Sequence, residues 1–149
     1  MTASDIAAWW GAILATIVLA WDIFKWLRSG VRLKVRVTPN MQVAGDETEK
    51  QLVHVEVVNR GDKTTTITHW AFYEFDSWLD RVRNKRKAMG IVPYPEGPDL
   101  PFELEPGKRW SATVAQAGLF AHFSHKQIFC VIIHSGSDKE ELCRLNVAE

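Results

Sequence analysis

The feature that most constrains this chain is an apolar segment near its start. No charged residue occurs between Ile6 and Trp21, and further apolar residues extend the segment to Leu27. At a rise of about 1.5 Å per residue, a helix over residues 6–27 would be about 33 Å long, close to the hydrocarbon thickness of a bilayer. The segment therefore predicts a single transmembrane helix.

Tryptophans near both ends of the segment support this prediction. Trp9 and Trp10 lie near one end, and Trp21 and Trp26 lie near the other. Indole is apolar but carries one N–H group, so tryptophan prefers the two interfaces of a membrane. We expect these side chains and two nearby cations to form the membrane-interface set: Trp9, Trp10, Trp21, Lys25, Trp26 and Arg28.

Two alternatives to a membrane anchor were weighed. A signal peptide starts with a basic region, whereas residues 1–8 contain Asp5 and no lysine or arginine. Val18-Leu19-Ala20 nevertheless resembles a cleavage site. A core helix of a soluble protein has a polar face, and this segment has almost none. We therefore favour the anchor.

The charges on the two sides of the segment predict its orientation. No basic residue precedes it, whereas five follow closely: Lys25, Arg28, Arg32, Lys34 and Arg36. Cytoplasmic flanks are enriched in lysine and arginine. The N-terminus is then expected outside and the rest of the chain in the cytoplasm.

Small residues form two adjacent rows along the predicted helix. At i, i+4 spacing, the helix-packing face comprises Ala7, Ala8, Gly11, Ala12, Ala15 and Thr16. Small side chains let helices approach closely in lipid, where van der Waals packing drives association. The face predicts a homo-oligomer or docking on a partner's membrane helix. The alternative is that alanine is simply common in such helices.

Residues 31–149 predict a β domain. Val31 to Thr38 alternates between apolar and polar residues, as a half-buried strand does, and Pro39-Asn40 is expected to end it. The other expected strands cover residues 52–59, 65–75, 109–115, 128–134 and 142–147. Asn59 to Asp62 predicts a turn, and Pro106-Gly107 fits the centre of a type II turn. Short strands without a βαβ rhythm favour an antiparallel sandwich or small barrel.

The closing hairpin carries both cysteines of the chain. If Gly136-Ser137 forms a two-residue type II′ loop, Gly136 takes a positive φ and Cys130 lies opposite Cys143. A four-residue loop would offset the two cysteines. In a reducing compartment both thiols are expected to stay free.

An insertion over residues 76–101 interrupts the strands. Ser77 is expected to cap a helix from Trp78 to about Lys87, and four prolines make residues 93–101 a loop. The insertion carries a basic patch of five residues: Arg81, Arg83, Lys85, Arg86 and Lys87. We favour a solvated connection over contact with anionic lipid headgroups or a membrane complex. Nucleic acid is not expected, because few aromatic residues accompany the cations.

Two turn motifs resemble those of bacterial Ig-like sandwich domains. These are Val55-Glu-Val-Val-Asn59-Arg-Gly61, followed by Thr66-Ile67, and Leu104-Glu-Pro-Gly107 before a strand. The whole chain is similar to small uncharacterised bacterial single-pass membrane proteins that carry such a domain. The resemblance implies an all-β, Ig-like antiparallel β-sandwich, preceded by one N-terminal transmembrane helix in the bacterial inner membrane. The core tryptophan and disulfide of antibody domains are not recognisable in the sequence.

No motif predicts catalysis, a cofactor or a metal. The chain lacks G-x-S-x-G, H-E-x-x-H and Walker sequences. His122 and His125 stand three apart, with His134 or Cys130 as a candidate third ligand, but no ligand of known proximity completes a site. Eighteen basic and eighteen acidic residues cancel, so net charge does not favour nucleic acid.

The sequence therefore predicts a membrane-anchored, non-enzymatic interaction module. Residues 1–30 would form the anchor and juxtamembrane segment. Residues 31–149 would form a cytoplasmic sandwich that binds a protein partner through its edge and the 76–101 insertion. One alternative is a membrane-perturbing effector or sensor of a bacterial defence or toxin system. Another is an envelope-facing adhesion or chaperone-like domain.

Overall fold

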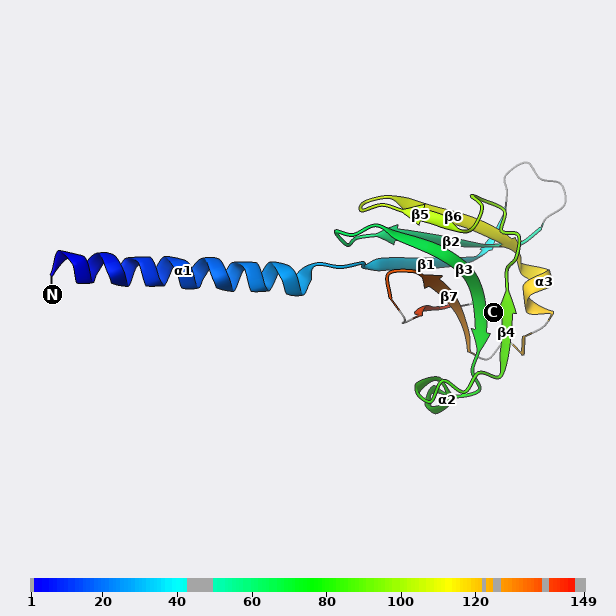
Figure 1. Cartoon of the computed structure of the whole chain (residues 1–149). Helices are drawn as coiled ribbons and strands as arrows, with labels where there is room; N and C mark the ends of the chain where they lie inside the picture. The colour runs from blue at the N-terminus through cyan, green and yellow to red at the C-terminus, as the bar shows by residue number, and fades with distance from the viewer. Residues whose placement is uncertain (1, 43–49, 122, 125–126, 138–139, 147–149) are drawn as a thin grey trace. The chain divides into compact units, whose positions relative to one another are not determined.

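The chain divides into two compact units, residues 1–30 and residues 31–149, in a computed structural model (Figure 1). The structure describes residues 2–42, 50–121, 123–124, 127–137 and 140–146. The first unit is a single helix, and the second is mostly β.

Helix α1 runs without a break from Ala3 to Arg28. Its first turn is held by the Thr2 N–H group, which donates to Asp5 Oδ2 at 2.8 Å. By length and composition, Ser4–Trp26 can cross a membrane, a test that an N-terminal signal sequence also passes. None of this span is buried in the structure.

The second unit consists of two antiparallel sheets. Sheet A has the order β1-β2-β6, formed by β1 Leu33–Met41, β2 Leu52–Asn59 and β6 Arg109–Ala115. Sheet B has the order β4-β3-β7-β8, and β5 also pairs with β3. Its strands are β3 Thr65–Glu74, β4 Ala88–Ile91, β5 Phe102–Leu104, β7 Ile128–His134 and β8 Glu141–Arg144. The two short helices are α2 Trp78–Val82 and α3 Gln116–Phe120.

The predicted strand at the start of the domain exists, but its bounds differ. β1 begins at Leu33 and continues through Pro39 to Met41. Its pairing with β2 shifts register between Thr38 and Met41, and Asn40 has a φ of 57°. Proline is tolerated on an edge strand at such an irregularity, because no ladder hydrogen bond is lost there. Pro39-Asn40 therefore bends the strand rather than ending it.

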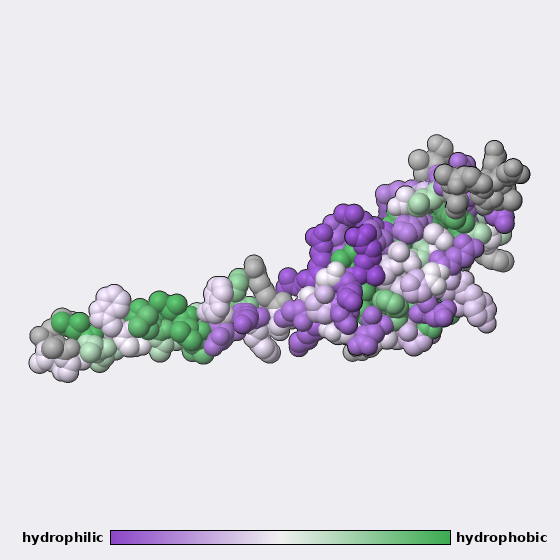
Figure 2. All heavy atoms as spheres, turned by 90° about the horizontal axis from the view of Figure 1, so that it is seen from above, coloured by the Kyte–Doolittle hydropathy of each residue, from purple (hydrophilic) through white to green (hydrophobic). Residues whose placement is uncertain are grey.

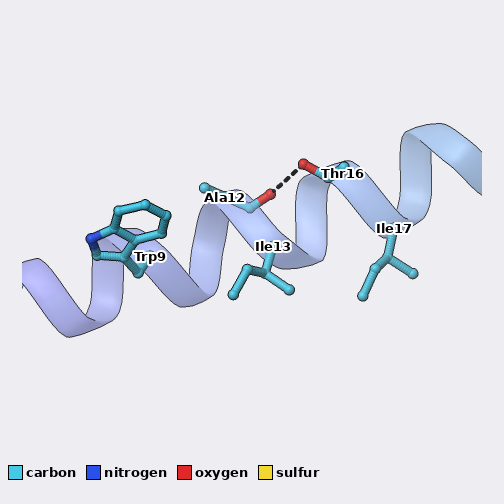
Figure 3. A pocket seen from close by; sticks show the side chains of 5 residues that line it. All are labelled: Trp9, Ala12, Ile13, Thr16 and Ile17. Atoms are coloured by element: carbon cyan, nitrogen blue, oxygen red, sulfur yellow. Dashed lines mark hydrogen bonds between the residues drawn. The ribbon is translucent and has the colours of Figure 1, made fainter.

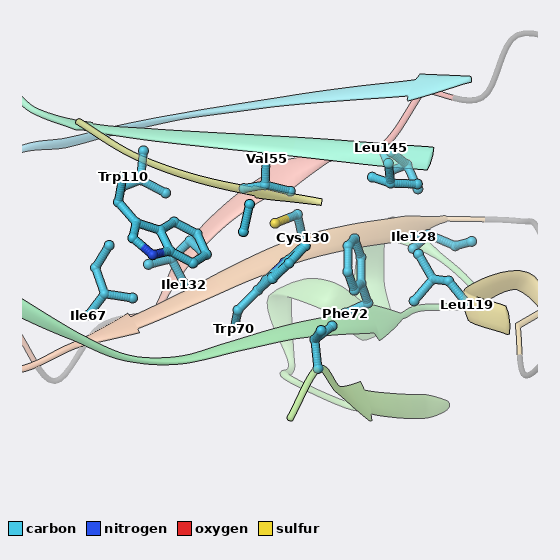
Figure 4. Packing of buried hydrophobic residues seen from close by; sticks show 14 of the residues in the cluster. Val55, Ile67, Trp70, Phe72, Trp110, Leu119, Ile128, Cys130, Ile132 and Leu145 are labelled. Carbon is cyan, nitrogen blue, oxygen red and sulfur yellow. The ribbon is translucent and has the colours of Figure 1, made fainter. Parts of the chain in front are cut away.

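The main core lies between the two sheets and is centred on two tryptophans. Trp70 on β3 and Trp110 on β6 are both fully buried, and their rings meet edge to face with centroids 5.8 Å apart. Figure 4 shows Cys130 and Phe72 beside them, with Val55 on the facing sheet. No core tryptophan was recognisable in the sequence, because Trp70 and Trp110 are brought together only by the packing of the sheets.

Sheet B is also apolar on its outer face. Alternate residues of β3 and β7 point away from the main core and form a second buried group, which we call the outer cluster: Ala71, Tyr73, Phe75, Phe129 and Val131. Strands that are buried on both faces have nearly continuous apolar sequences. This double burial explains why the sequences of Trp70–Phe75 and Ile128–Ile133 show little alternation between apolar and polar residues.

The turn after β2 forms as expected, and the side chain of Asn59 stabilises it. Asn59 is fully buried, and its Nδ2 donates to Lys63 O at 2.8 Å and to Leu104 O at 3.0 Å. Its Oδ1 accepts from the Gly61 N–H group at 2.9 Å. The asparagine side chain, rather than a positive φ, therefore holds this turn.

The other two turn predictions have opposite outcomes. Gly107 has a φ of 76°, and the Lys108 N–H group donates to Glu105 O at 3.0 Å, as a type II turn requires. Gly136 does not take a positive φ, so the type II′ prediction is wrong. A Cβ at Gly136 would lie 2.5 Å from Val31 Cγ2, so the glycine is needed for close approach instead.

The insertion is more structured than predicted. Ser77 caps α2, because its Oγ accepts from the Asp80 N–H group at 3.2 Å, but the helix ends at Val82 rather than near Lys87. Asn84 has a φ of 53°, which is incompatible with a continuing helix. The chain then forms β4, which pairs with β3. Neither β4 nor β5 was predicted.

Candidate interaction surfaces

Two arginines of the basic patch cover the outer cluster. The Arg86 guanidinium lies over the Tyr73 ring, 4.1 Å from its centroid, and Arg81 lies 5.2 Å from the centroid of Phe129. A guanidinium stacks on an aromatic face through cation–π attraction. Arg81 and Arg86 therefore serve the fold as a lid over apolar side chains.

Glu140 completes this lid from the other side. Arg86 Nη2 donates to both carboxylate oxygens of Glu140 at 3.0 Å, and the Tyr73 hydroxyl donates to Oε1 at 2.9 Å. Burial and the hydrogen bond to Glu140 raise the pKa of the Tyr73 phenol. The sequence did not reveal this triad, because its members lie up to 67 positions apart.

A third cation of the basic patch is also held internally. Lys87 Nζ lies 3.0 Å from Asp76 Oδ1 and 3.9 Å from Glu74 Oε1. Glu74 is only 1% exposed, and its Oε1 also accepts from the Ser124 N–H group at 3.1 Å. The hydrogen bond to Asp76 and the two carboxylate charges raise the pKa of Lys87. Lys87 thus balances a buried carboxylate.

The remaining cations of the basic patch are exposed. Within the described residues, no ion pair is formed by Arg83 or Lys85. The helix before them exposes Trp78, Leu79 and Val82 and buries no residue. The predicted five-residue patch therefore divides into three cations that support the fold and two that face solvent.

A notch interrupts the edge of sheet B along β3. β5 pairs with Thr65–Ile67, and β4 pairs with Ala71–Glu74. The Val92 N–H group donates to Trp70 O at 3.0 Å, so the gap between the two short strands falls at Thr68 and His69. The notch has a volume of about 400 Å³ and is lined by Thr68, His69, Ile91, Val92, Pro93, Leu100 and Pro101. Five of these lining residues belong to the 76–101 insertion. A volume of this size and an apolar lining are typical of binding pockets.

Helix α1 has a shallow apolar notch of its own. Figure 3 shows it beside Trp9, and its volume is about 270 Å³. Of the predicted helix-packing face, Ala12 and Thr16 line the notch, whereas Gly11 faces open space. The Thr16 hydroxyl donates to Ala12 O at 2.8 Å, so its hydrogen bond is already made within the helix. Ala7, Ala8 and Ala15 are exposed but lie outside the notch.

The predicted membrane-interface residues all lie on α1. Trp9, Trp10, Trp21 and Trp26 are exposed, as is Lys25. The side chain of Arg28 lies outside the described part of the structure. Figure 2 shows the apolar side chains gathered along the middle of α1.

The cysteines lie in the predicted register. Cys130 on β7 pairs with Cys143 on β8, and both thiols are free. This is the register expected for a two-residue loop, although Gly136 lacks the positive φ of a type II′ turn and residues 138–139 lie outside the described part of the structure. Burial raises the pKa of both thiols, and Cys130 belongs to the main core. Both are therefore weak nucleophiles.

Of the three histidines considered as metal ligands, the structure describes only His134, whereas His122 and His125 lie outside the described residues. His134 is buried, with Nδ1 3.0 Å from Thr65 Oγ1, and the Gly136 N–H group donates to the same nitrogen at 3.2 Å. Burial lowers the pKa of His134. Among the described residues, no group of three potential ligands is close enough to hold a metal.

Comparison with known proteins gives no family. No family model matches the chain, and no curated protein matches it. A Bordetella pertussis protein provisionally named ApaA is 11% identical, with a TM-score of 0.41 over 79% of this chain and 91% of its own. The structural-genomics target SoR45 is 14% identical, with a TM-score of 0.35 over 80% of this chain and 85% of its own. Similarity at this level assigns no activity or partner.

Proposed function

We propose that this chain is a membrane-anchored, non-enzymatic interaction module in which α1 is a single membrane span. The observation that carries the proposal is the exposure of an apolar helix on all sides. Ser4–Trp26 is long enough to cross a bilayer, and none of it is buried by protein. An uncovered apolar helix is stable in hydrocarbon, where all its backbone hydrogen bonds are internal, but not in water.

The proposed location is a bacterial inner membrane with the sandwich in the cytoplasm. Five cations lie at or just after the end of the apolar segment, between Lys25 and Arg36, and none precedes the segment. This asymmetry supports the proposed orientation under the positive-inside rule. Two free thiols directly opposite each other on β7 and β8 are consistent with a reducing compartment.

We propose further that the sandwich is Ig-like. Its sheets, β1-β2-β6 and β4-β3-β7-β8, correspond in strand order to A-B-E and C′-C-F-G of such domains. Trp70 on the third strand contributes to the same core as Cys130 on β7. Antibody domains carry a core tryptophan and a disulfide cysteine on the equivalent strands. Val55 of β2 faces them where the second cysteine would be (Figure 4).

The proposed partner surface is the notch on the β3 edge. Its lining is mostly apolar, and the adjoining loop presents Tyr94, which is 91% exposed. Irregular loops on a rigid sandwich are common recognition surfaces. An apolar side chain of a protein partner fits this chemistry, with the Thr68 and His69 side chains supplying polar contacts.

The anchor is tested by membrane extraction and by mass. The full chain should stay with membranes after alkaline carbonate washing, and its intact mass should include residues 1–20. Cleavage after Ala20 would instead identify a signal sequence. An impermeant thiol reagent on intact cells should label Ser4→Cys but not Tyr94→Cys, and the reverse pattern would place the sandwich outside.

The partner surface is tested by site-specific photo-crosslinking in cells. A crosslinker at Ile91 or Tyr94 should give a discrete adduct that the same group at exposed Lys108 does not give. Ile91→Asp should abolish the adduct formed from position 94. Equal adducts from all positions, or none from the notch, would remove the notch from the proposal.

Self-association through α1 is a second proposal, supported by the notch at Trp9, Ala12 and Thr16. Ala12→Leu would fill this notch, whereas Gly11→Leu would point into open space. In full chains reconstituted into bilayers, energy transfer between labelled copies should fall for Ala12→Leu and persist for Gly11→Leu. Equal transfer in both would contradict packing at this face.

A further inference from the structure

Helix α2 presents an apolar surface that the sandwich does not use. Trp78, Leu79 and Val82 are 59%, 54% and 64% exposed, and no residue of the helix is buried. Residues at i, i+1 and i+4 of a helix lie on one side of it. Figure 1 shows α2 protruding beyond the end of β3. The exposed side chains therefore form one apolar tip, which we call the α2 tip.

Uncommitted positive charge follows the α2 tip directly. Residues 76–87 contain five basic and two acidic residues, which gives a net charge of +3. Arg81, Arg86 and Lys87 contact rings or carboxylates of the fold, whereas Arg83 and Lys85 are exposed and form no ion pair within the described residues. Asp80 Oδ2 accepts a hydrogen bond from the Ser77 hydroxyl at 2.7 Å, and the net charge of the segment is positive with this carboxylate counted.

We propose that the α2 tip, with Arg83 and Lys85, inserts into the headgroup layer of an anionic bilayer as a second membrane contact. This inference rests on the proposed anchoring of the chain by α1. Tryptophan partitions to the interface, leucine and valine favour the acyl boundary, and each nearby cation strengthens attraction to anionic lipid about fivefold. The charge on the α2 tip complements an anionic leaflet.

The anchor makes this contact effective even though α2 is short. A five-residue helix with three apolar side chains would bind a membrane weakly by itself. Once α1 holds the chain on the same membrane, insertion of the α2 tip becomes an intramolecular step at high effective concentration. The second contact would restrict the orientation of the sandwich at the surface and hence which edges a partner can reach.

The test uses the full chain in lipid nanodiscs with an environment-sensitive fluorophore at Leu79→Cys. Cys143→Ser removes the half-exposed thiol, and Cys130 is buried. Lipid-attached quenchers should reduce the emission in discs containing phosphatidylglycerol, and much less in discs of phosphatidylcholine alone. The same label at Tyr94→Cys, another highly exposed position, should not be quenched.

Charge variants separate this contact from general attraction. Arg83→Gln with Lys85→Gln should lower the ratio of docked to undocked α2 tip by about 25-fold. The matched control, Lys50→Gln with Lys63→Gln, removes the same charge elsewhere and should leave the quenching unchanged. Trp78→Ala should also reduce quenching, because the indole is lost from the interface.

Three results would overturn the inference. The first is an absence of quenching at position 79 in anionic discs. The α2 tip would then be a surface for a protein partner rather than for lipid. The second is equal quenching at positions 79 and 94. The third is quenching that does not depend on phosphatidylglycerol or on Arg83 and Lys85. Failure of the proposed anchor would show separately, because the chain would then not elute with the discs.

Discussion

Sheet B buries apolar side chains on both faces, but different groups cover the two faces. The inner face packs against the valines and Trp110 of sheet A. The outer cluster is covered by the stems and guanidinium groups of Arg81 and Arg86, with Glu140 holding Arg86 in place. Long charged side chains can cover apolar surface while their charged ends reach water. A basic run in a sequence can therefore be part of a fold rather than a binding site.

The first and largest expected effect is on the inner face. Trp110→Ala should lower the free energy of unfolding by about 4 kcal/mol, because it leaves a large cavity beside Trp70. Urea unfolding of the full chain in detergent, followed by circular dichroism, measures this. Trp78→Ala on the exposed α2 tip is the control and should change stability by less than about 0.5 kcal/mol. Similar losses in both variants would contradict the assigned core.

The second prediction concerns the cover of the outer face. Arg86→Ala should lower the free energy of unfolding by about 1–2 kcal/mol, since it removes both a cation–π contact and a charge-assisted hydrogen bond. Arg86→Lys should recover only part of the loss, because an ammonium group cannot stack flat on Tyr73. Full recovery by lysine would show that charge alone holds the cover.

The pKa of Tyr73 gives a spectroscopic readout of the same cover. Glu140→Gln should bring the raised pKa of Tyr73 back toward its usual value, because it removes the carboxylate charge. Arg86→Ala should raise the pKa further, because the nearby positive charge lowers it. Ultraviolet titration in a Tyr94→Phe background isolates this phenol, since the chain has two tyrosines. Shifts in the opposite directions would contradict the triad.

A third, smaller effect is expected at the end of the inner face, where His134 is buried. Burial lowers its pKa in the folded state, so the unfolded chain binds the proton more readily. Its contribution to stability is therefore complete above the unfolded pKa of about 6.5 and is lost as the pH falls through the folded pKa. His134→Gln should flatten this dependence relative to the unmodified chain. If the free energies of unfolding of the two chains changed in parallel between about pH 5 and 7, the predicted role of His134 would be contradicted.

The smallest effect is a difference in reactivity between the two opposed thiols of the closing hairpin. In the folded chain, Cys143 should react slowly with iodoacetamide, because its pKa is raised but its side chain is only half-buried. Cys130 should react only after unfolding, because it is fully buried. Mass spectrometry of timed samples distinguishes the two. Equal rates in the folded chain would place Cys130 outside the core.

Local patterns predicted much of the β framework. The bounds of β2 and β6 were correct, as were the start and end of β7 and the register of Cys130 opposite Cys143. These strands combine β-branched residues with clear turn signals at their ends. β4 and β5 were missed because they are three or four residues long and depend on pairing with β3.

The candidate surfaces were predicted only in outline. The sandwich edge and the 76–101 insertion were expected to meet a partner, and both contribute to the notch on β3. The notch itself could not be foreseen, because it exists only where two short strands leave a gap. The basic patch was predicted as a unit, whereas its five members have separate roles in the structure.

By itself, the sequence determined where an apolar helix forms and where the longer strands lie, since both depend on periodicity and turn residues close together in the chain. Only the tertiary structure decided which cations are engaged and which are exposed. Arg86 meets Glu140 across 54 positions, and Tyr73 meets it across 67. Such contacts arise from the pairing of strands and the covering of a second apolar face, and no local pattern encodes them.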